Sequence, residues 1–578
     1  MVQRRRPLTS ASHPEYARRG RHEGPAERRR ARRPRRRLTG AEQRESVETA
    51  QIDRARPENR GLPPGRQARR DDRLPARDRA RCSGVRPDPG PVRLIFLRYR
   101  AVVNVRLALP VAAAAALVAA SSAAAFTPTN AYYPKQWYLD KDHAFDAWAT
   151  PPPLQPVKVA IVDSGVECSL PDFQGQIAAK KSFVGGDPCI DTQGHGTIVA
   201  GEIAGDLNSA GVVGLAYSSQ LLVAKVVAAD GTIPLKAEAD GIRWAVDQGA
   251  QVVNLSFGDV RDPLKPTLDT YSKVEAQAVA YAVKKGAVVV AAVGNSDDAY
   301  ATPWEYASWP AALPHVIGVA ALSHSGDVPD FSDRDPTFVD IAAPGVGIFS
   351  TFPKLLTSRQ QGCTPQGYTD CATKDYRQPA GTSFAAPQVS AAAALLLGLL
   401  PSLTNSQVAT ILERHADDVD ASTGCAACPV GRDKYSGWGR LDVQKAVAAL
   451  SSGAPLPAPD RLEPNDGVSQ AHALWGSKPA IAATLDYWDD PKDVYRVKLT
   501  PGQRVHVLVR AQWSGAAVGL TLLRQGTNTG ATRVAKTARP GKTQRLSYRA
   551  RKAGWYDVQL QVTHPESGRY TLRLSKSS

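Results

Sequence analysis

Between residues 157 and 450, short runs of β-branched residues alternate with longer segments whose apolar positions recur at helical spacing. This alternation is typical of a mostly parallel sheet with helices on both faces. The expected strands are 157–162, 221–227, 252–256, 287–293 and 316–321, and the expected helices are 236–248, 270–285 and 384–400. The last helix is almost wholly apolar, which indicates a buried central helix. The pattern therefore predicts an α/β domain.

After residue 450 the pattern changes. Residues 451–467 form a Pro-rich linker. Beyond it, short segments that alternate apolar and polar residues are separated by Gly, Pro and Asn, at 494–499, 504–510, 519–523, 544–548, 556–562 and 570–574. This period of two, interrupted by turn signals, predicts an all-β sandwich over residues 468–578.

The formal net charge of +17 arises in the first 100 residues, which hold 29 Arg, no Lys and 12 acidic residues. The remainder carries 43 basic and 43 acidic residues. With few apolar positions, residues 1–101 are expected to be a disordered tail. Three interpretations stay open: a basic arm that contacts phosphates, an extended leader, or a segment upstream of the true translation start. We favour the third interpretation. Selection for positive charge would accept both Lys and Arg, whereas a segment with 29 Arg and no Lys is more consistent with a GC-rich reading frame.

Residues 102–125 have the character of a secretory signal. Arg98, Arg100 and Arg106 precede an apolar run over 107–120, and small residues follow at 121–125. The alternative is a membrane anchor, but the run is short and mostly alanine for a bilayer span. We expect cleavage after Ala125, secretion, no membrane attachment afterwards and loss of the Arg-rich tail. The tail has no aromatic platform or folded motif, so no nucleic-acid partner is expected.

The six cysteines after residue 125 are an even set: Cys168, Cys189, Cys363, Cys371, Cys425 and Cys428. In an exported chain this indicates disulfides. Sequence proximity suggests the pairs 168–189, 363–371 and 425–428, although six cysteines permit other pairings. The 425–428 spacing also suits a redox pair or half a metal site. No βαβ context or second cysteine pair supports either alternative, so we expect a structural bridge.

Three segments carry side chains suited to nucleophilic catalysis. The strand at 159–163 ends in Asp163, His195 opens a helical stretch, and Ser383 opens the apolar helix. Acyl transfer by a serine requires a base for the hydroxyl proton and a carboxylate that holds the imidazole tautomer. All three residues lie where strands end or helices begin, at the ligand-binding edge of an open α/β sheet. Any one of them alone would more often be a turn or loop residue.

A second set of groups would stabilise an oxyanion. A serine at a helix N-terminus offers its own backbone N–H and the helix dipole. The second donor is expected to be the side-chain amide of Asn295, at the end of an apolar strand, where Gly294 permits close approach of the backbone.

Together these residues resemble the subtilisin-like serine peptidases. Four motifs match in order: Asp163-Ser-Gly, His195-Gly-Thr, Gly-Asn295, and Gly-Thr-Ser383-Phe-Ala-Ala-Pro. The resemblance covers roughly residues 130–450 and implies a three-layer α/β/α domain within 126–450. It further implies a monomeric endopeptidase that hydrolyses proteins or peptides through an acyl-enzyme, without a catalytic cofactor. Phe384 stands where Met is frequent, and little chain separates Ala125 from the domain for an inhibitory pro-domain.

The resemblance also implies binding residues. Ser256, Phe257 and Gly258 match the strand that pairs with substrate backbone and walls the primary specificity pocket. Asp172 and Asn208 lie where relatives hold a structural Ca²⁺ with a carboxylate and loop carbonyls. The segment 354–378 either shapes the primed subsites or is a surface loop without substrate contacts.

The C-terminal segment resembles the pre-peptidase C-terminal domains of secreted bacterial hydrolases. The matching residues are at 463–467, 490–496 and 568–572. Its acidic residues, which either bind calcium or are solvated loop charges, are Glu463, Asp466, Asp489, Asp490 and Asp493.

Overall fold

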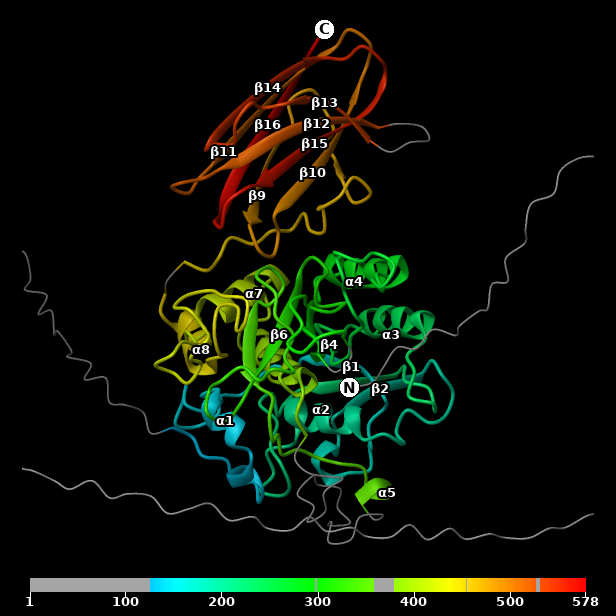
Figure 1. Ribbon diagram of the computed structural model, residues 1–578, viewed down its shortest axis with the longest axis vertical. Coiled ribbons are helices and arrows are strands. Elements are labelled where there is room, and N and C mark those ends of the chain that lie inside the picture. The colour runs from blue at the N-terminus through cyan, green and yellow to red at the C-terminus, as the bar shows by residue number, and fades with distance from the viewer. Residues whose placement is uncertain (1–124, 297–298, 358–378, 454, 526–530) are drawn as a thin grey trace, which may run out of the picture. The chain divides into compact units, whose positions relative to one another are not determined.

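The computed structural model describes residues 125–296, 299–357, 379–453, 455–525 and 531–578, which belong to one compact unit (Figure 1). The predicted Arg-rich tail, the residues of the expected signal up to 124 and the expected Cys363–Cys371 pair lie outside the described residues. The bridges Cys168–Cys189 and Cys425–Cys428 are present, so these two pairings are confirmed.

The first domain contains a sheet of seven strands in the order β2-β3-β1-β4-β5-β6-β7, in which all neighbours are parallel. The strands are β1 Lys158–Asp163, β2 Ile177–Ser182, β3 Gln220–Lys225, β4 Val252–Leu255, β5 Val288–Ala292, β6 Val316–Leu322 and β7 Ile341–Pro344. From β1 the chain adds β3 on one side and β4 on the other. The carboxyl end of β1 is therefore a topological switch point, where ligands bind in open α/β sheets.

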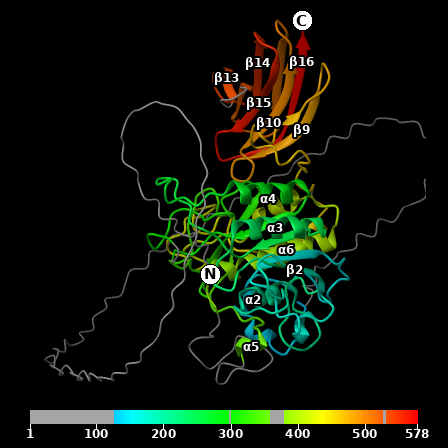
Figure 2. The same ribbon diagram turned by 90° about the vertical axis from the view of Figure 1, so that its right-hand side faces the viewer.

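Helices cover both faces of this sheet (Figure 2). The helices are α1 Trp137–Lys141, α2 His195–Ala204, α3 Leu235–Asp247, α4 Lys273–Lys284, α5 Lys354–Thr357, α6 Ala386–Leu399, α7 Asn405–Arg414 and α8 Val443–Ser451, with 3₁₀ turns at Tyr133–Lys135, Pro171–Phe173 and Thr382–Phe384. Val159 and Ile161 pack in the core that contains α2, α6 and α7, whereas Ala160 and Val162 pack with α3 and α4. Alternate residues of one strand thus face opposite helical layers, which confirms the predicted three-layer α/β/α fold.

The apolar helix lies in the centre of the domain. The helical stretch Thr382–Leu399 is long and apolar enough to span a membrane, but 94% of it is buried inside the protein. Its buried Gln388 Nε2 lies within hydrogen-bond distance of Glu202 Oε2 and of the carbonyls of Pro344 and Phe384. The stretch is therefore a core helix, as the sequence predicts.

The sheet also contains two strands that the sequence pattern did not predict. Both lie at its edges, where no further strand of the described residues follows, although Ala342 of β7 forms an isolated bridge with Arg440. In β2, exposed and partly buried residues alternate and Lys180 and Lys181 are exposed, while β7 has only four residues. Neither has the long apolar run that identifies a central strand.

The second domain consists of two sheets, β13-β12-β15-β10-β8 and β14-β11-β16-β9. Apart from the parallel pair β8 and β10, neighbouring strands are antiparallel. The strands are β8 His472–Ala473, β9 Ala480–Asp486, β10 Lys492–Leu499, β11 Arg504–Ala511, β12 Val518–Gln525, β13 Ala531–Lys536, β14 Thr543–Arg549, β15 Gly554–Val562 and β16 Ser567–Ser577. Their inward residues share one core. The expected C-terminal all-β sandwich is thus present.

Candidate active site

Asp163 and His195 lie side by side at the carboxyl edge of the parallel sheet. Asp163 is the last residue of β1 and His195 is the first residue of α2. His195 Nδ1 lies 2.8 Å from Asp163 Oδ1 and 3.0 Å from Oδ2. The carboxylate is 1% exposed and His195 is 9% exposed. This buried pair fixes the imidazole through Nδ1 and leaves Nε2 for another partner.

The loop that presents His195 is organised by Asp191, which sequence reasoning missed. Asp191 accepts hydrogen bonds from the backbone N–H groups of Gly194 and Thr197, at 2.8 and 3.0 Å, and from the Ser164 hydroxyl at 2.9 Å. Gly194 has a φ of 87°, and a Cβ there would lie 2.4 Å from the Phe352 ring. A carboxylate shortly before a helix start is a helix-capping signal, and this signal could have identified Asp191.

Ser383 lies in the 3₁₀ turn that leads into α6 and is 1% exposed. The ring of its neighbour Phe384 lies 5.4 Å from the His195 ring, so the serine segment and the histidine share one edge. Ser383 Oγ and His195 Nε2 are both buried, and neither has a hydrogen-bond partner in the described part of the chain. The two atoms that a nucleophile–base pair requires are therefore both available.

Asn295 lies after β5, and its orientation is fixed by the residue before Ser383. Its Oδ1 accepts hydrogen bonds from the backbone N–H and the hydroxyl of Thr382, at 3.0 and 2.9 Å. With the amide oxygen held by Thr382, Nδ2 is the group left to serve a ligand. A Cβ at Gly294 would lie 2.2 Å from Asp333 Oδ2 and from Ser308 Oγ, so only glycine fits before Asn295.

The segment after β4 is hydrogen-bonded to the backbone of Ser383. Ser256 Oγ donates to the Ser383 carbonyl at 2.7 Å, and Asn254 Nδ2 donates to Ser256 Oγ at 2.9 Å. Phe257 is 1% exposed and packs in the core with α3 and α4. Gly258 is also buried. The Ser256 and Phe257 side chains thus make contacts inside the protein. The backbone of 256–258 is therefore the group that can face a substrate.

The candidate calcium loop lies at residues 206–212. Asn130 Nδ2 lies 2.8, 2.6 and 2.9 Å from the carbonyl oxygens of Asp206, Ala210 and Val212. Asp172 Oδ1 accepts from the Val212 N–H at 2.9 Å, and the exposed Asn208 accepts from the Ala210 N–H at 2.9 Å. The loop thus gathers three carbonyl oxygens and the side-chain oxygens of Asp172 and Asn208, and oxygen ligands of this kind suit Ca²⁺.

Comparison with known proteins places this geometry in a family. A family model described as the subtilase family matches residues 155–439. The chain is 32% identical over 326 residues to the thermophilic serine proteinase of Bacillus sp. (strain AK1), which covers 56% of this chain and 70% of that protein. It is 36% identical over 293 residues to the subtilisin of Bacillus pumilus, which covers 50% of this chain and 90% of that protein. Among solved structures it is similar to sphericase, with 29% identity, a TM-score of 0.43 and coverage of 53% of this chain and 97% of the other. The chain belongs to the subtilase family of serine endopeptidases.

Proposed function

We propose that this chain is a secreted, monomeric endopeptidase that cleaves proteins and peptides through an acyl-enzyme, with Asp163, His195 and Ser383 as its catalytic triad. The single observation that supports this best is the buried Asp163–His195 hydrogen bond at the edge that also carries Ser383. The bond holds the imidazole in the tautomer whose Nε2 accepts a proton.

The first step is attack of Ser383 Oγ on the carbonyl carbon of the scissile peptide. His195 Nε2 takes the hydroxyl proton as the C–O bond forms, and Asp163 stabilises the resulting imidazolium without itself becoming protonated. His195 then gives that proton to the leaving amine as the C–N bond breaks. In the second half a water molecule repeats the sequence against the acyl-enzyme, which regenerates Ser383.

Asn295 and the backbone N–H of Ser383 are assigned to the oxyanion. Thr382 holds Asn295 Oδ1 through two hydrogen bonds, so Nδ2 is oriented before the substrate arrives. A donor that needs no reorganisation during the reaction stabilises the developing negative charge most effectively. The backbone of Ser256, Phe257 and Gly258 is assigned to pairing with the substrate chain, because these residues follow β4 at the same edge.

A structural Ca²⁺ is assigned to the 206–212 loop with Asp172 and Asn208. The Asn130 amide group has two hydrogens but lies within hydrogen-bond distance of three carbonyls, while its buried Oδ1 has no hydrogen-bond partner in the described residues. The two ends of an amide side chain are interchangeable in shape. Turned over, Oδ1 faces the three carbonyls, and oxygen ligands of this kind suit a calcium ion. The ion would stabilise the loop and take no part in the reaction.

The remaining assignments concern organisation and location. We assign residues 102–125 to a cleaved signal, 126–450 to the peptidase domain, 451–467 to a linker and 468–578 to a pre-peptidase C-terminal domain. The resemblance at 463–467, 490–496 and 568–572 supports the last assignment. Sequencing the N-terminus of the protein recovered from culture medium tests secretion and cleavage together. The assignment requires a chain that begins at Phe126.

The activity is tested by cleavage of denatured casein with the purified chain and its Ser383→Ala and His195→Ala variants. The wild-type chain should cleave and become acylated at Ser383 by a fluorophosphonate probe, and both variants should lose nearly all turnover. Ser325→Ala, at an exposed serine, is the matched control and should be fully active. Equal cleavage by wild type and Ser383→Ala would refute the triad.

The calcium assignment is tested separately, by thermal unfolding of the Ser383→Ala chain in calcium and in chelator. Calcium should raise the unfolding midpoint of the parent chain, because a ligand that binds only the folded state stabilises that state. It should have little effect on the midpoint of Asp172→Asn, which lacks one of the proposed ligands. Asp240→Asn on α3 is the control and should respond like the parent. An unfolding midpoint that does not depend on calcium would indicate that the Asn130 amide takes the place of the ion.

A further inference from the structure

A buried acidic cluster lies where the linker and the β-sandwich meet the peptidase domain. Its carboxylates are Asp460, Glu463, Asp466, Asp490 and Asp493, and the peptidase domain contributes His315, directly before β6. Sequence reasoning left open whether the acidic residues here are solvated. In the structure Asp466, Asp490 and Asp493 are 9%, 6% and 0% exposed, so the solvated interpretation does not hold for them.

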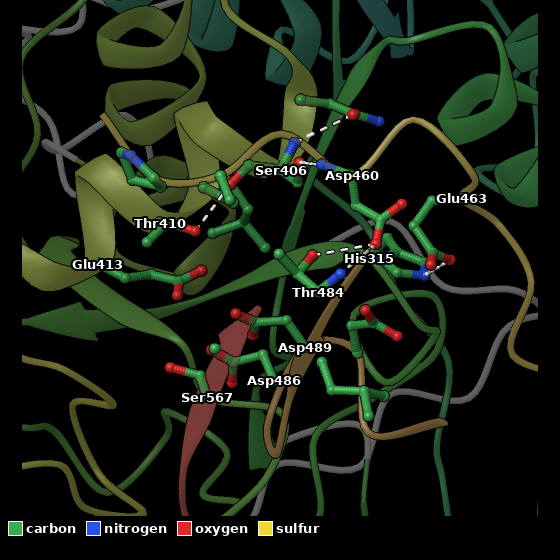
Figure 3. Close-up of a pocket in the computed structure, with 18 of the residues that line it drawn as sticks. His315, Ser406, Thr410, Glu413, Asp460, Glu463, Thr484, Asp486, Asp489 and Ser567 are labelled. Carbon is green, nitrogen blue, oxygen red and sulfur yellow. Dashed lines mark hydrogen bonds and ion pairs between the residues drawn. The ribbon is translucent and has the colours of Figure 1, made fainter. Parts of the chain in front are cut away.

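Four of these residues converge on one point. His315 Nε2 lies 2.9 Å from Glu463 Oε2 and 3.3 Å from Asp466 Oδ1, and Asp490 joins them with all four ligand atoms within 4.8 Å of one another. Figure 3 shows His315 and Glu463 pointing toward each other. The group thus combines one imidazole nitrogen with three carboxylates from a different part of the chain.

Several polar atoms of this group make no hydrogen bond in the described residues although they are buried. His315 Nε2, both oxygens of Asp466 and Asp490 Oδ1 make no hydrogen bond in the described part of the chain, because the close contacts do not have hydrogen-bond geometry. Buried polar atoms are normally satisfied, and their convergence without shared protons indicates a missing common ligand.

No Lys or Arg in the described residues compensates the charge of this cluster. Within the described residues none of its five carboxylates forms an ion pair with Lys or Arg, and His315 is the only basic side chain that pairs with them. A divalent cation would supply positive charge to these buried carboxylates.

We propose that His315, Glu463, Asp466 and Asp490 bind a divalent transition-metal ion such as Zn²⁺ or Mn²⁺, which fastens the peptidase domain to the C-terminal domain. The imidazole ligand indicates which type of metal ion binds. Ca²⁺ prefers a shell of six to eight oxygens, whereas imidazole with carboxylates suits first-row transition metals. A cavity of about 240 Å³ reaches the group, and its wall includes His315, Glu463 and Asp490 (Figure 3). The ion enters through this cavity.

The test uses the full chain with Ser383→Ala, which prevents self-digestion, after removal of metals with a chelator. Co²⁺ absorption spectroscopy reports on nitrogen and carboxylate ligation, and calorimetric titration with Zn²⁺ gives affinity and stoichiometry. One ion per chain is expected. His315→Asn should weaken binding at least tenfold and alter the cobalt spectrum, and Asp466→Asn should also weaken it. His506→Asn, at an exposed histidine of β11, should bind like the parent.

Three outcomes would overturn the proposal. The first is equal Zn²⁺ binding by the parent chain and a folded His315→Asn chain. The second is no binding by a parent chain that has native circular dichroism. The third is calcium binding that His315→Asn leaves unchanged and Asp493→Asn abolishes. That result would place the cation on the all-carboxylate group Asp460, Asp490 and Asp493 and exclude His315 as a ligand.

Discussion

The hydroxyl of Ser256 donates a 2.7 Å hydrogen bond to the backbone carbonyl of Ser383, 127 residues further along the chain. Asn254 donates to the same hydroxyl, and Ser390 Oγ donates to Asn254 Oδ1 at 2.8 Å. This chain of buried hydrogen bonds connects β4 with Ser383 and with Ser390 of α6. Ser383, the proposed nucleophile, is therefore held by its backbone, while its Oγ makes no hydrogen bond in the described residues.

We predict that Ser256→Ala disturbs the position of Ser383 and leaves substrate binding unchanged. It removes the donor to the Ser383 carbonyl and the acceptor for Asn254, and such buried unpaired groups cost about 1–3 kcal/mol each. Urea unfolding should show a loss of this size, and kcat should fall while KM for a peptide ester changes little. The exposed Ser325→Ala serves as control. A KM effect without a kcat effect would instead place the Ser256 side chain in substrate binding.

Asn295→Ala should reduce kcat by about 10²–10³ with little change in KM, the loss that removal of one oxyanion donor causes in subtilisin. The donor acts only when the carbonyl oxygen becomes charged, so ground-state binding is unaffected. Steady-state kinetics on a peptide anilide measures both constants. Full turnover by a folded Asn295→Ala chain would show that another group holds the oxyanion.

Glu202 in α2 provides a pH-dependent prediction. Burial raises its pKa well above the ordinary value of 4.5, nearby Asp142 adds to this, and the hydrogen bond from Gln388 opposes it. Because the folded state holds the proton more tightly than the unfolded state, stability is highest at acid pH and falls as pH rises above about 4.5. Glu202→Gln keeps the shape and the Gln388 contact without a titrating group. The free energy of unfolding of Glu202→Gln, relative to that of the parent chain, should therefore increase from pH 5 to pH 8.

Unfolding of both chains in the Ser383→Ala background, at several pH values across this range, measures the difference. Glu305→Gln, at a half-exposed residue paired with Lys434, is the matched control and should run parallel to the parent. If Glu202→Gln also ran parallel to the parent, the Glu202 carboxyl would titrate normally in the folded protein.

Trp488 joins the two domains. Its ring lies 4.9 Å from the Trp438 ring at 79°, and the guanidinium groups of Arg414 and Arg432 lie 5.3 and 4.9 Å from its centre. Arg414 also pairs with Asp486 at 2.7 Å. Edge-to-face and cation–π contacts of this kind contribute about 0.5–2 kcal/mol each. Trp488→Ala should therefore lower the unfolding midpoint by several degrees.

The same substitution should increase proteolytic cleavage within residues 451–467, because a loosened domain exposes the linker to a protease. Trp475→Ala is the matched control, since Trp475 is 71% exposed, and it should unfold close to the parent. Equal effects of both variants would mean that the Trp488 contacts do not connect the domains.

The sequence alone determined the fold class. All residues of hydrophobic runs such as Val159–Val162 are buried, so both faces of the strand are covered. Parallel sheets between two helical layers cover both faces of their strands in this way. The period of two after residue 467 determined the sandwich in the same way. The candidate chemistry also follows from local patterns, because Asp163, His195, Asn295 and Ser383 each lie at the end of a strand or the start of a helix, and that edge is common to all.

Only the tertiary structure decided how side chains far apart in sequence pair with one another. Asn130 meets the 206–212 loop, Ser256 meets Ser383, and His315 meets carboxylates about 150 residues later. Asn130 and His315 lie outside the periodic patterns, and a single polar residue in a loop is equally compatible with solvent and with a buried partner. Which of the two it meets depends on strand order and on the packing of the two domains. Those are properties of the assembled core and not of any local segment.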